Sequence, residues 1–250
     1  MPSNDIKGTT ALVTGASRGF GRGIAAALDG AGAAVVGVAR DGAALEELRA
    51  ELGESFTPVS ADAADPTVAG QLIDAYRPGI LVLNAGAAPL SRPLQHHTWQ
   101  TFSRNWDVDV KQVLHWLREA LLAPLAPGST VITMSSGAAL RGSPLSGGYA
   151  GAKATIRFIT SYAAAESERD GLGIRFISVL PQLTPATALG GAAVAAYAAR
   201  EGMDVAAYLE RSGPALTPGQ AGEAFVALAS DPGHAAGPYL LTAAGLSPVT

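Results

Sequence analysis

Short apolar runs alternate with longer alanine-rich stretches along the whole chain. The short runs, rich in β-branched residues, predict strands at 10–14, 34–39, 56–60, 80–84, 129–135, 174–180 and 239–242. The stretches between them predict helices at 21–31, 43–52, 66–76, 98–122, 149–170 and 217–230. Because the inner runs are apolar almost throughout, their strands must be covered on both faces. The alternation therefore predicts an α/β fold, a doubly wound parallel β-sheet of about seven strands with helices on both faces.

The domain organisation is expected to be simple. The 250 residues contain no internal repeat and no long linker, so we expect a single domain over 1–250. One segment, at about 182–214, interrupts the alternation between the sixth strand and the last helix. A segment inserted at the carboxyl end of a strand would suit a lid over a bound ligand, and a small helical hairpin that extends the core is the equal alternative.

Composition narrows the possible functions. Hydrophobic residues make up 48% and charged residues 15%, which allows a large core. The net charge of −4 without a basic block gives nucleic-acid or membrane binding no electrostatic support. The absence of cysteine excludes disulfides and thiolate metal sites, and no His, Asp or Glu cluster has metal-ligand spacing.

The sequence also suggests where the protein works. No charged N-terminal region is followed by an apolar run, and no apolar stretch is long enough to span a bilayer. We therefore expect a cytoplasmic protein, which agrees with the lack of cysteine. The preference for Ala, Gly and Arg over Lys suggests a bacterial, GC-rich genome.

A tyrosine and a lysine stand four residues apart at Tyr149 and Lys153, and Ser136 lies thirteen residues upstream of the tyrosine. On a helix, residues four apart share a face. An ammonium beside a phenol stabilises the phenolate, so such a pair can move a proton near neutral pH. A nearby serine hydroxyl could hold the oxygen that gains or loses that proton. An exposed helix that carries the pair by chance is the alternative.

A glycine-rich turn follows the first strand directly and leads into a helix. Gly15, Gly19 and Gly21 let the turn close tightly and let backbone amides approach a pyrophosphate at the helix N-terminus. Ser17 and Phe20 belong to the same loop. The spacing differs from G-x-G-x-x-G, and the loop lacks the Gly-Lys-Ser/Thr of a P-loop, so the strand–turn–helix context carries the prediction of a dinucleotide site.

The end of the second strand bears on the choice of nucleotide. Ala39 offers no carboxylate for a ribose 2′-hydroxyl, whereas Arg40 offers a planar fork suited to a 2′-phosphate. Arg18 could reach the same group. Asp41 would take the ribose if the strand ended two residues later, and solvated surface charge is the alternative for both arginines. We therefore favour NADP(H), with NAD(H) possible.

Taken together, these motifs resemble the short-chain dehydrogenase/reductase family, in its compact single-domain branch, over about residues 7–246. Asp62, after the third strand, matches the aspartate that binds the adenine ring. Asn84, Ala85 and Gly86, after the fourth strand, resemble the family's Asn-Ala-Gly motif, which supports the central sheet and the cofactor ribose. The resemblance implies a Rossmann-type fold that binds a nicotinamide cofactor.

Ser136, Tyr149 and Lys153 match the family's catalytic serine, tyrosine and lysine, spacing included. By this resemblance Tyr149 is the general acid in reduction and the general base in oxidation. Lys153 would stabilise the phenolate and bind the nicotinamide ribose, and Ser136 would hydrogen-bond the substrate oxygen. The hydride passes between nicotinamide and substrate carbon, which is the cofactor's chemistry.

One departure from the family lies in the helix after the fourth strand, where the family has a fourth catalytic residue, an asparagine. This chain has Asp109 there. In the family the asparagine shapes the helix backbone and helps to hold a water that contacts the lysine. We hypothesise that Asp109 keeps Lys153 charged and ties it up, which makes Tyr149 a weaker acid. A solvated or amide-capped Asp109 that changes little is the alternative.

A second departure follows the sixth strand, where the family usually has Pro-Gly and this chain has Pro181 and Gln182. The loop over the nicotinamide is therefore expected to lie differently. Pro181 and Thr184 are our candidate cofactor contacts in this loop. Residues 243–246 also replace the family's more usual Asp-Gly-Gly.

The expected pocket walls, 87–94, 137–145 and 182–214, are mostly apolar, and the lid has no cationic residue before Arg200. We therefore expect an apolar or aromatic ketone and its secondary alcohol as substrates. His96 and His97 are expected to be a solvated pair rather than pocket groups.

Two alternatives to an oxidoreductase remain at this point. One is a non-redox enzyme on the same fold, such as a dehydratase, epimerase or cyclase, and the other is a nucleotide-binding regulator without turnover. The resemblance also implies a homo-oligomer, a dimer or homotetramer, built on the helices at 98–122 and 149–170. Six apolar residues are available there, some of which must face the sheet: Trp106, Val110, Val113, Leu117, Phe158 and Tyr162.

Overall fold

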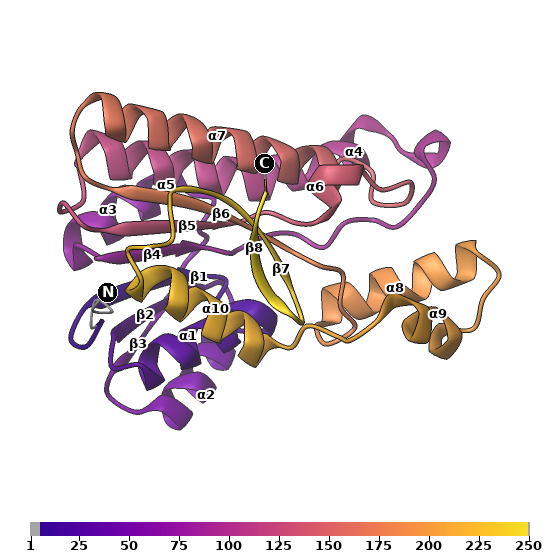
Figure 1. Ribbon diagram of the computed structural model, residues 1–250, viewed down its shortest axis with the longest axis horizontal. Coiled ribbons are helices and arrows are strands. Elements are labelled where there is room, and N and C mark those ends of the chain that lie inside the picture. The colour runs from indigo at the N-terminus through magenta and orange to yellow at the C-terminus, as the bar shows by residue number, and fades with distance from the viewer. Residues whose placement is uncertain (1–5, 250) are drawn as a thin grey trace.

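The computed structural model describes residues 6–249, so the first five residues, where no leader sequence is expected, lie outside the described part. One eight-stranded sheet runs through the molecule in the order β3-β2-β1-β4-β5-β6-β7-β8 (Figure 1). Its strands are β1 (Thr10–Thr14), β2 (Ala34–Ala39), β3 (Phe56–Ser60), β4 (Ile80–Leu83), β5 (Thr130–Met134), β6 (Arg175–Pro181), β7 (Gly237–Thr242) and β8 (Gly245–Pro248). All neighbouring strands from β3 to β7 are parallel, which confirms the doubly wound sheet.

Helices cover both faces of the sheet, as Figure 1 shows. One layer contains α1 (Gly19–Gly30), α2 (Gly42–Leu52) and α10 (Pro218–Ser230), and the other contains α3 (Pro66–Tyr76), α5 (Lys111–Leu122) and α7 (Tyr149–Arg169). Side chains alternate along β1, with Ala11 and Val13 in the core beneath the first layer and Leu12 in the core beneath the second. Two hydrophobic cores therefore hold the carboxyl ends of the parallel strands at one edge, where ligands bind in such folds.

The prediction of about seven strands missed β8. Thr242 pairs with Gly245 across the two-residue turn Ala243-Ala244, and β8 runs antiparallel to β7. Gly245 has φ +112°, and the Thr242 hydroxyl accepts a hydrogen bond from Ala244 N at 3.2 Å. Ala-Ala is not a recognisable hairpin turn, so the sequence pattern gave no sign of the extra strand.

The helix predicted over 98–122 is helical without a break from Trp99 to Leu122, but it is not α-helical throughout. The segment contains α4 (Trp99–Asn105), a π-helix η2 (Trp106–Val110) and then α5, preceded by the short 3₁₀ helix η1 (Leu94–His96). The π turn adds a residue to one helical turn, and such bulges are frequent at functional sites. Asn105 and Asp109 both bond to Ala87, so contacts with the loop after β4 accompany the bulge.

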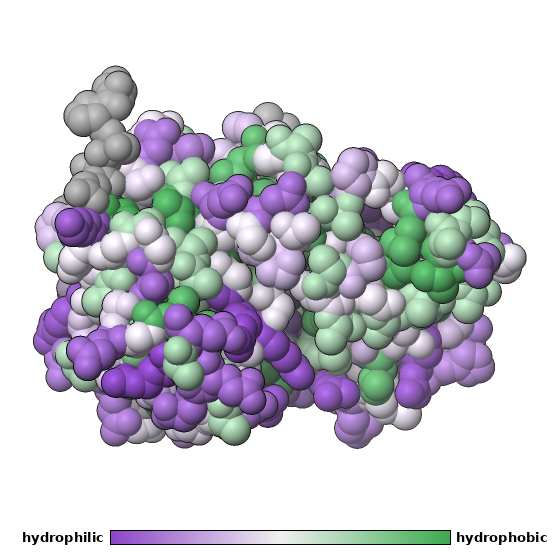
Figure 2. Space-filling model, turned by 90° about the horizontal axis from the view of Figure 1, so that it is seen from below, coloured by the Kyte–Doolittle hydropathy of each residue, from purple (hydrophilic) through white to green (hydrophobic). Residues whose placement is uncertain are grey.

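The segment after β6 forms two helices, α8 (Ala188–Arg200) and α9 (Val205–Ser212), which project from the body. In the view of Figure 1 they lie below α4 and the short helix α6 (Ala138–Arg141). Figure 2 shows apolar surface gathered over the α8–α9 pair, whereas the half that carries α1 and α2 is mostly hydrophilic. Leu183, Leu189 and Val205 are exposed in this region. Among the described residues, no helix is long and apolar enough to cross a membrane.

Candidate active site

In the glycine-rich turn after β1, the backbone packs so closely that two of its glycines leave no room for a side chain. Gly15 has φ +70°, and a Cβ there would lie 2.8 Å from Ala85 Cα. A Cβ on Gly21 would lie 2.1 Å from the carbonyl oxygen of Gly15. Only glycine fits either position, so the loop backbone is free to approach a ligand at the N-terminus of α1.

A buried hydrogen-bond network ties this turn to the loop after β4. Asn84 Nδ2 donates to the carbonyl oxygens of Thr14 and Gly15, at 3.1 and 3.2 Å. The Thr14 hydroxyl accepts from the backbone amides of Asn84 and Ala85 and donates to Gln112 Oε1 at 2.6 Å. Gln112 Nε2 in turn donates to the carbonyl oxygen of Ala85 at 3.2 Å. The Asn-Ala motif therefore holds two ligand-facing turns in one fixed arrangement.

The charged residues expected at the nucleotide site lie at the carboxyl ends of β1, β2 and β3. Arg18 and Arg40 are exposed, and neither guanidinium has a hydrogen bond or ion pair within the described residues. Asp41 Oδ1 accepts from Ala44 N at 3.2 Å and caps α2. Asp62 is exposed and accepts from Ala64 N at 3.0 Å. Within the described residues Arg18 and Arg40 are thus unpaired, whereas the Asp41 carboxylate already caps α2.

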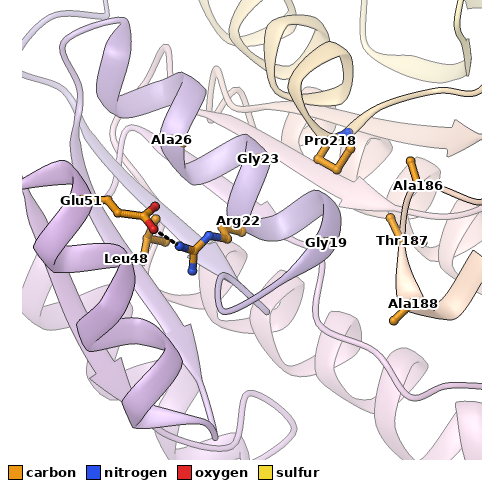
Figure 3. A pocket seen from close by; sticks show the side chains of 10 residues that line it. All are labelled: Gly19, Arg22, Gly23, Ala26, Leu48, Glu51, Ala186, Thr187, Ala188 and Pro218. Atoms are coloured by element: carbon orange, nitrogen blue, oxygen red, sulfur yellow. Dashed lines mark hydrogen bonds and ion pairs between the residues drawn. The ribbon is translucent and has the colours of Figure 1, made fainter.

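A cleft of about 370 Å³ adjoins the glycine loop (Figure 3). It lies between the first turns of α1, the end of α2, residues 186–188 and Pro218. Arg22 on α1 pairs with Glu51 on α2 at 2.5 Å across its wall. A Cβ on Gly19 would lie 3.6 Å from Thr187 Cγ2, so the beginning of the α8–α9 segment reaches the glycine loop directly.

The tyrosine and lysine stand at the start of α7, where the end of β5 meets them. Tyr149 is the first residue of the helix, and Lys153 Nζ lies 5.6 Å from the centroid of its ring. Lys153 Nζ donates to the carbonyl oxygen of Met134 at 3.0 Å, and Ser135 Oγ donates to the carbonyl oxygen of Lys153 at 2.7 Å. Ser136 follows directly, half-buried, with Oγ accepting from Ala138 N. The structure therefore brings Tyr149 and Lys153 together, and the bonds of Lys153 to Met134 and Ser135 hold the chain directly before Ser136 beside them.

Asp109 is the fourth member of this group. Its Oδ2 lies 3.1 Å from Lys153 Nζ, and the two side chains are 1% and 5% exposed. Its Oδ1 accepts from Ala87 N at 2.8 Å, and a Cβ on Gly86 would lie 2.9 Å from Oδ2. Asp109 is thus a buried ion-pair partner, which excludes the alternative that it is mostly solvated.

The charge of Lys153 follows from this environment. Burial lowers the pKa of Lys153, but the Asp109 carboxylate and, next, the Tyr149 phenol raise it by more, so the pKa lies above its ordinary value of 10.5. Lys153 is therefore an ammonium at neutral pH.

Sequence reasoning missed two polar residues that support this arrangement. Asn105 Nδ2 donates to the carbonyl oxygen of Ala87 at 2.6 Å, and Gln112 belongs to the network with Thr14. Both are almost fully buried. Their spacing from Asp109, four residues before and three after, places polar groups on one helical face, and this was the available signal.

The polar side chains of the loop after β6 bond to the chain that leads into α10. Gln182 Nε2 donates to the carbonyl oxygen of Pro214, and Thr184 Oγ1 donates to that of Leu216, both at 2.7 Å. Thr184 is 2% exposed, so its hydroxyl already has a partner inside the protein. Pro181 ends β6, and its carbonyl oxygen accepts from Gly137 N at 2.9 Å.

The two histidines differ from each other. His96 is exposed, as expected, but the expectation of a solvated His97 was wrong. A Cβ on Gly147 would lie 2.7 Å from His97 Cε1, and His97 Nε2 is buried without a hydrogen-bond partner among the described residues. His97 therefore packs on the turn that precedes Tyr149.

Comparison with known proteins agrees with this geometry. Residues 9–198 match the family model described as short chain dehydrogenase. The chain belongs to the short-chain dehydrogenase/reductase family. It is accordingly an oxidoreductase that acts between CH–OH and C=O groups with a nicotinamide cofactor, which argues against the non-redox enzyme and the regulator.

Characterised short-chain dehydrogenases/reductases resemble the chain over about two thirds to three quarters of its length. D-erythrulose reductase of Gallus gallus is 31% identical over 66% of this chain and 68% of its own. L-xylulose reductase of Bos taurus is 31% identical over 72% and 74%. The crystal structure of 3-ketoacyl-(acyl-carrier-protein) reductase from Brucella melitensis, complexed with NADH, covers 95% of this chain and 98% of its own with a TM-score of 0.77. At 23% identity, this last likeness confirms the fold.

Proposed function

We propose that this protein is an NADP(H)-dependent oxidoreductase that interconverts an apolar or aromatic ketone and its secondary alcohol, with Tyr149 as general acid and base. The observation that carries the proposal is the contact of charged Lys153 with the Tyr149 ring at the carboxyl end of β5, where Ser135, the residue before Ser136, bonds to the Lys153 backbone. A regulator that only bound nucleotide would need no such proton-transfer group.

Each residue has a distinct part in the proposed reaction. The bound nicotinamide supplies or accepts the hydride. Ser136 Oγ, half-buried beside the start of α7, donates to the substrate oxygen and orients it. In reduction Tyr149 gives its proton to that oxygen, and the Lys153 ammonium stabilises the phenolate that remains. In oxidation the same groups act in reverse.

The glycine loop fits a dinucleotide, because its tight turn exposes backbone amides at the N-terminus of α1. We propose that Arg18 and Arg40 bind a 2′-phosphate, since both guanidinium groups are exposed and unpaired in the described structure. The use of Asp41 as the cap of α2 supports the same choice. Asp62 would hold the adenine, and residues 84–86 would support the ribose.

Arg40→Ala is expected to weaken NADPH binding about tenfold and to leave NADH binding unchanged, because one charge-assisted contact to the phosphate is lost. Titration of nucleotide fluorescence measures both dissociation constants. Arg22→Ala is the matched control, since Arg22 is already paired with Glu51. If Arg40→Ala weakened the binding of both nucleotides equally, Arg40 would not bind the 2′-phosphate. If the unmodified protein bound NADH more tightly than NADPH, Asp41 would be the residue that selects the nucleotide.

Asp109→Asn is expected to move the rising limb of the pH profile for alcohol oxidation down by about one pH unit. Tyr149 must lose its proton in this direction, and the buried carboxylate opposes that loss while the Lys153 ammonium favours it. Asparagine keeps the acceptor for Ala87 N and removes the opposing charge. Initial rates from pH ~6 to ~10 measure the shift.

Asp107→Asn makes the same change of charge on the exposed side of η2 and serves as the control. Identical profiles for the Asp109 variant and the unmodified enzyme would show that the ion pair has no effect on proton transfer.

The proposed substrate class is supported by apolar side chains around the site. Leu94, Leu140, Leu183 and Leu189 are exposed on the segments expected to form the pocket walls. Leu145, by contrast, is buried and belongs to the core. The test compares the rates at which the enzyme reduces aryl and alkyl methyl ketones with the rates for D-erythrulose and L-xylulose. The loss of NADPH absorbance measures each rate. Faster turnover of the two sugars would overturn the substrate proposal and leave the redox assignment intact.

We also propose a homo-oligomer assembled on α5 and α7. Phe158 and Tyr162 are exposed on the face of α7 that contains Gly151, and Trp106 of η2 lies beside that glycine. Val113 and Leu117, which the sequence left unassigned, face the core instead.

Phe158→Glu is expected to reduce the molar mass measured by light scattering to that of the 25.2-kDa chain, because a charge would have to be buried at the interface. Val205→Glu places the same charge on an exposed apolar position of α9 and should leave the mass unchanged. Loss of assembly in both variants would argue against the α5–α7 face.

A further inference from the structure

Side chains pin both ends of the lid segment, residues 185–213, to each other. Gln182 bonds to the backbone of Pro214, and Thr184 bonds to the backbone of Leu216. Each bond joins residues that are 32 positions apart. The entry and the exit of the segment therefore lie side by side, and α8 and α9 extend from a single base.

Beyond this base the lid segment packs mainly on itself. α9 contains no buried side chain, and α8 packs chiefly against α9. At the base the fit is tight, since a Cβ on Gly190 would lie 1.8 Å from the carbonyl oxygen of Thr184. Few contacts therefore determine where the far part of the lid segment lies on the body, so each one has a large influence.

One such contact joins α8 to the turn that precedes the active-site helix. The Tyr197 hydroxyl and Ser143 Oγ share a hydrogen bond. Ser143 Oγ also accepts from Ser146 N at 3.1 Å, and the carbonyl oxygen of Ser146 accepts from Tyr149 N at 2.9 Å. A continuous chain of hydrogen bonds thus runs from the lid segment to the first residue of α7.

The turn itself depends on such bonds, because glycines surround it. Gly142 and Gly147 have φ +74° and +54°, and Gly148 follows immediately. Glycine restricts its own backbone little, so hydrogen bonds must supply much of the order of this turn. The bonds of Ser143 and Ser146 do so together with Arg92 N, which donates to the carbonyl oxygen of Leu145 at 2.8 Å.

We propose that Ser143 and Tyr197 form a latch that couples the closed lid segment to the placement of Tyr149. With the latch bonded, the lid segment lies against the body and the Ser143–Ser146 turn is fixed. With the latch open, the lid segment swings on its base and the turn loosens, so substrate enters while Tyr149 is poorly placed. Both are positioning residues, and the proposal rests on the proposed function, in which Tyr149 is the acid and base.

Hydrogen–deuterium exchange of the full chain without cofactor or substrate tests the latch. Tyr197→Phe keeps the ring and removes only the hydroxyl. Exchange is expected to accelerate about threefold to tenfold both in 185–213 and in 144–149, as the loss of one hydrogen bond predicts. Tyr208→Phe is the control, because this α9 tyrosine rests on Arg211 and its hydroxyl has no hydrogen bond among the described residues.

Ser143→Ala should accelerate exchange in 185–213 to the same extent, and in 144–149 by at least as much, because Ser146 N also loses its acceptor. Adding Tyr197→Phe to it should produce no more in the lid segment. In turnover, either variant is expected to lower kcat about threefold or more while raising KM, whereas a mere substrate contact at Tyr197 would raise KM alone. Unchanged exchange, or acceleration confined to 185–213, overturns the latch. Because exchange needs no chemistry, an inactive enzyme with accelerated exchange would overturn only the proposed function.

Discussion

Lys153→Met is expected to lower the free energy of unfolding by about 3 kcal/mol or more. The substitution keeps the length of the side chain but leaves Asp109, 1% exposed, without its cation at 3.1 Å. The carbonyl oxygen of Met134 also loses its donor. Urea unfolding at neutral pH, followed by circular dichroism, measures the change.

A second substitution separates the charge from the packing. In Lys153→Met/Asp109→Asn the unpaired carboxylate is gone, so most of the lost stability should return although activity does not. Lys111→Met removes an exposed lysine of α5 and is the matched control, with an expected change within about 0.5 kcal/mol. If the double variant were less stable than Lys153→Met, the ion pair would not be the source of the loss.

Tyr149→Phe is expected to lower kcat for ketone reduction by about 10²–10⁴ while the dissociation constant for NADPH changes little. The phenol is the group placed to give a proton to the substrate oxygen, and Lys153 remains charged beside the ring through Asp109. Single-turnover reduction by saturating NADPH measures the chemical step separately from binding.

Tyr162→Phe is the control on the same helix, since Tyr162 is 61% exposed and thirteen residues further along α7. It should retain full activity. If the Tyr149→Phe variant kept more than about a tenth of the activity, another group would be the proton donor, and Tyr149 would serve only in binding.

The parallel sheet could be predicted from the sequence because its signals are local. Apolar runs of the right length, separated by capped helices, need no knowledge of tertiary contacts. The helices predicted at 66–76 and 217–230 begin within one residue of α3 and α10 in the structure. The order of motifs along the chain placed the candidate site in the same way.

The missed features depend on residues far away in the sequence. The π turn accompanies bonds between η2 and Ala87, and nothing in the pattern of 98–122 marks the extra residue. The partial burial of His97 depends on Gly147, fifty residues later, which leaves room for the imidazole. Gln182 Nε2 donates to the carbonyl oxygen of Pro214, thirty-two residues later. Local sequence cannot show such partners.

The shared base of the lid segment also bears on how such an enzyme changes over evolution. Gln182 and Thr184 join the two ends of the segment through the carbonyl oxygens of Pro214 and Leu216. Because these acceptors are backbone atoms outside the segment, the link between β6 and the start of α10 does not depend on the residues inserted between them. Lengthening a closed loop costs little, about 0.6 kcal/mol for each doubling. Insertions or exchanges in this segment are therefore expected to cost little stability, and under the proposed function they are where a new substrate preference would arise.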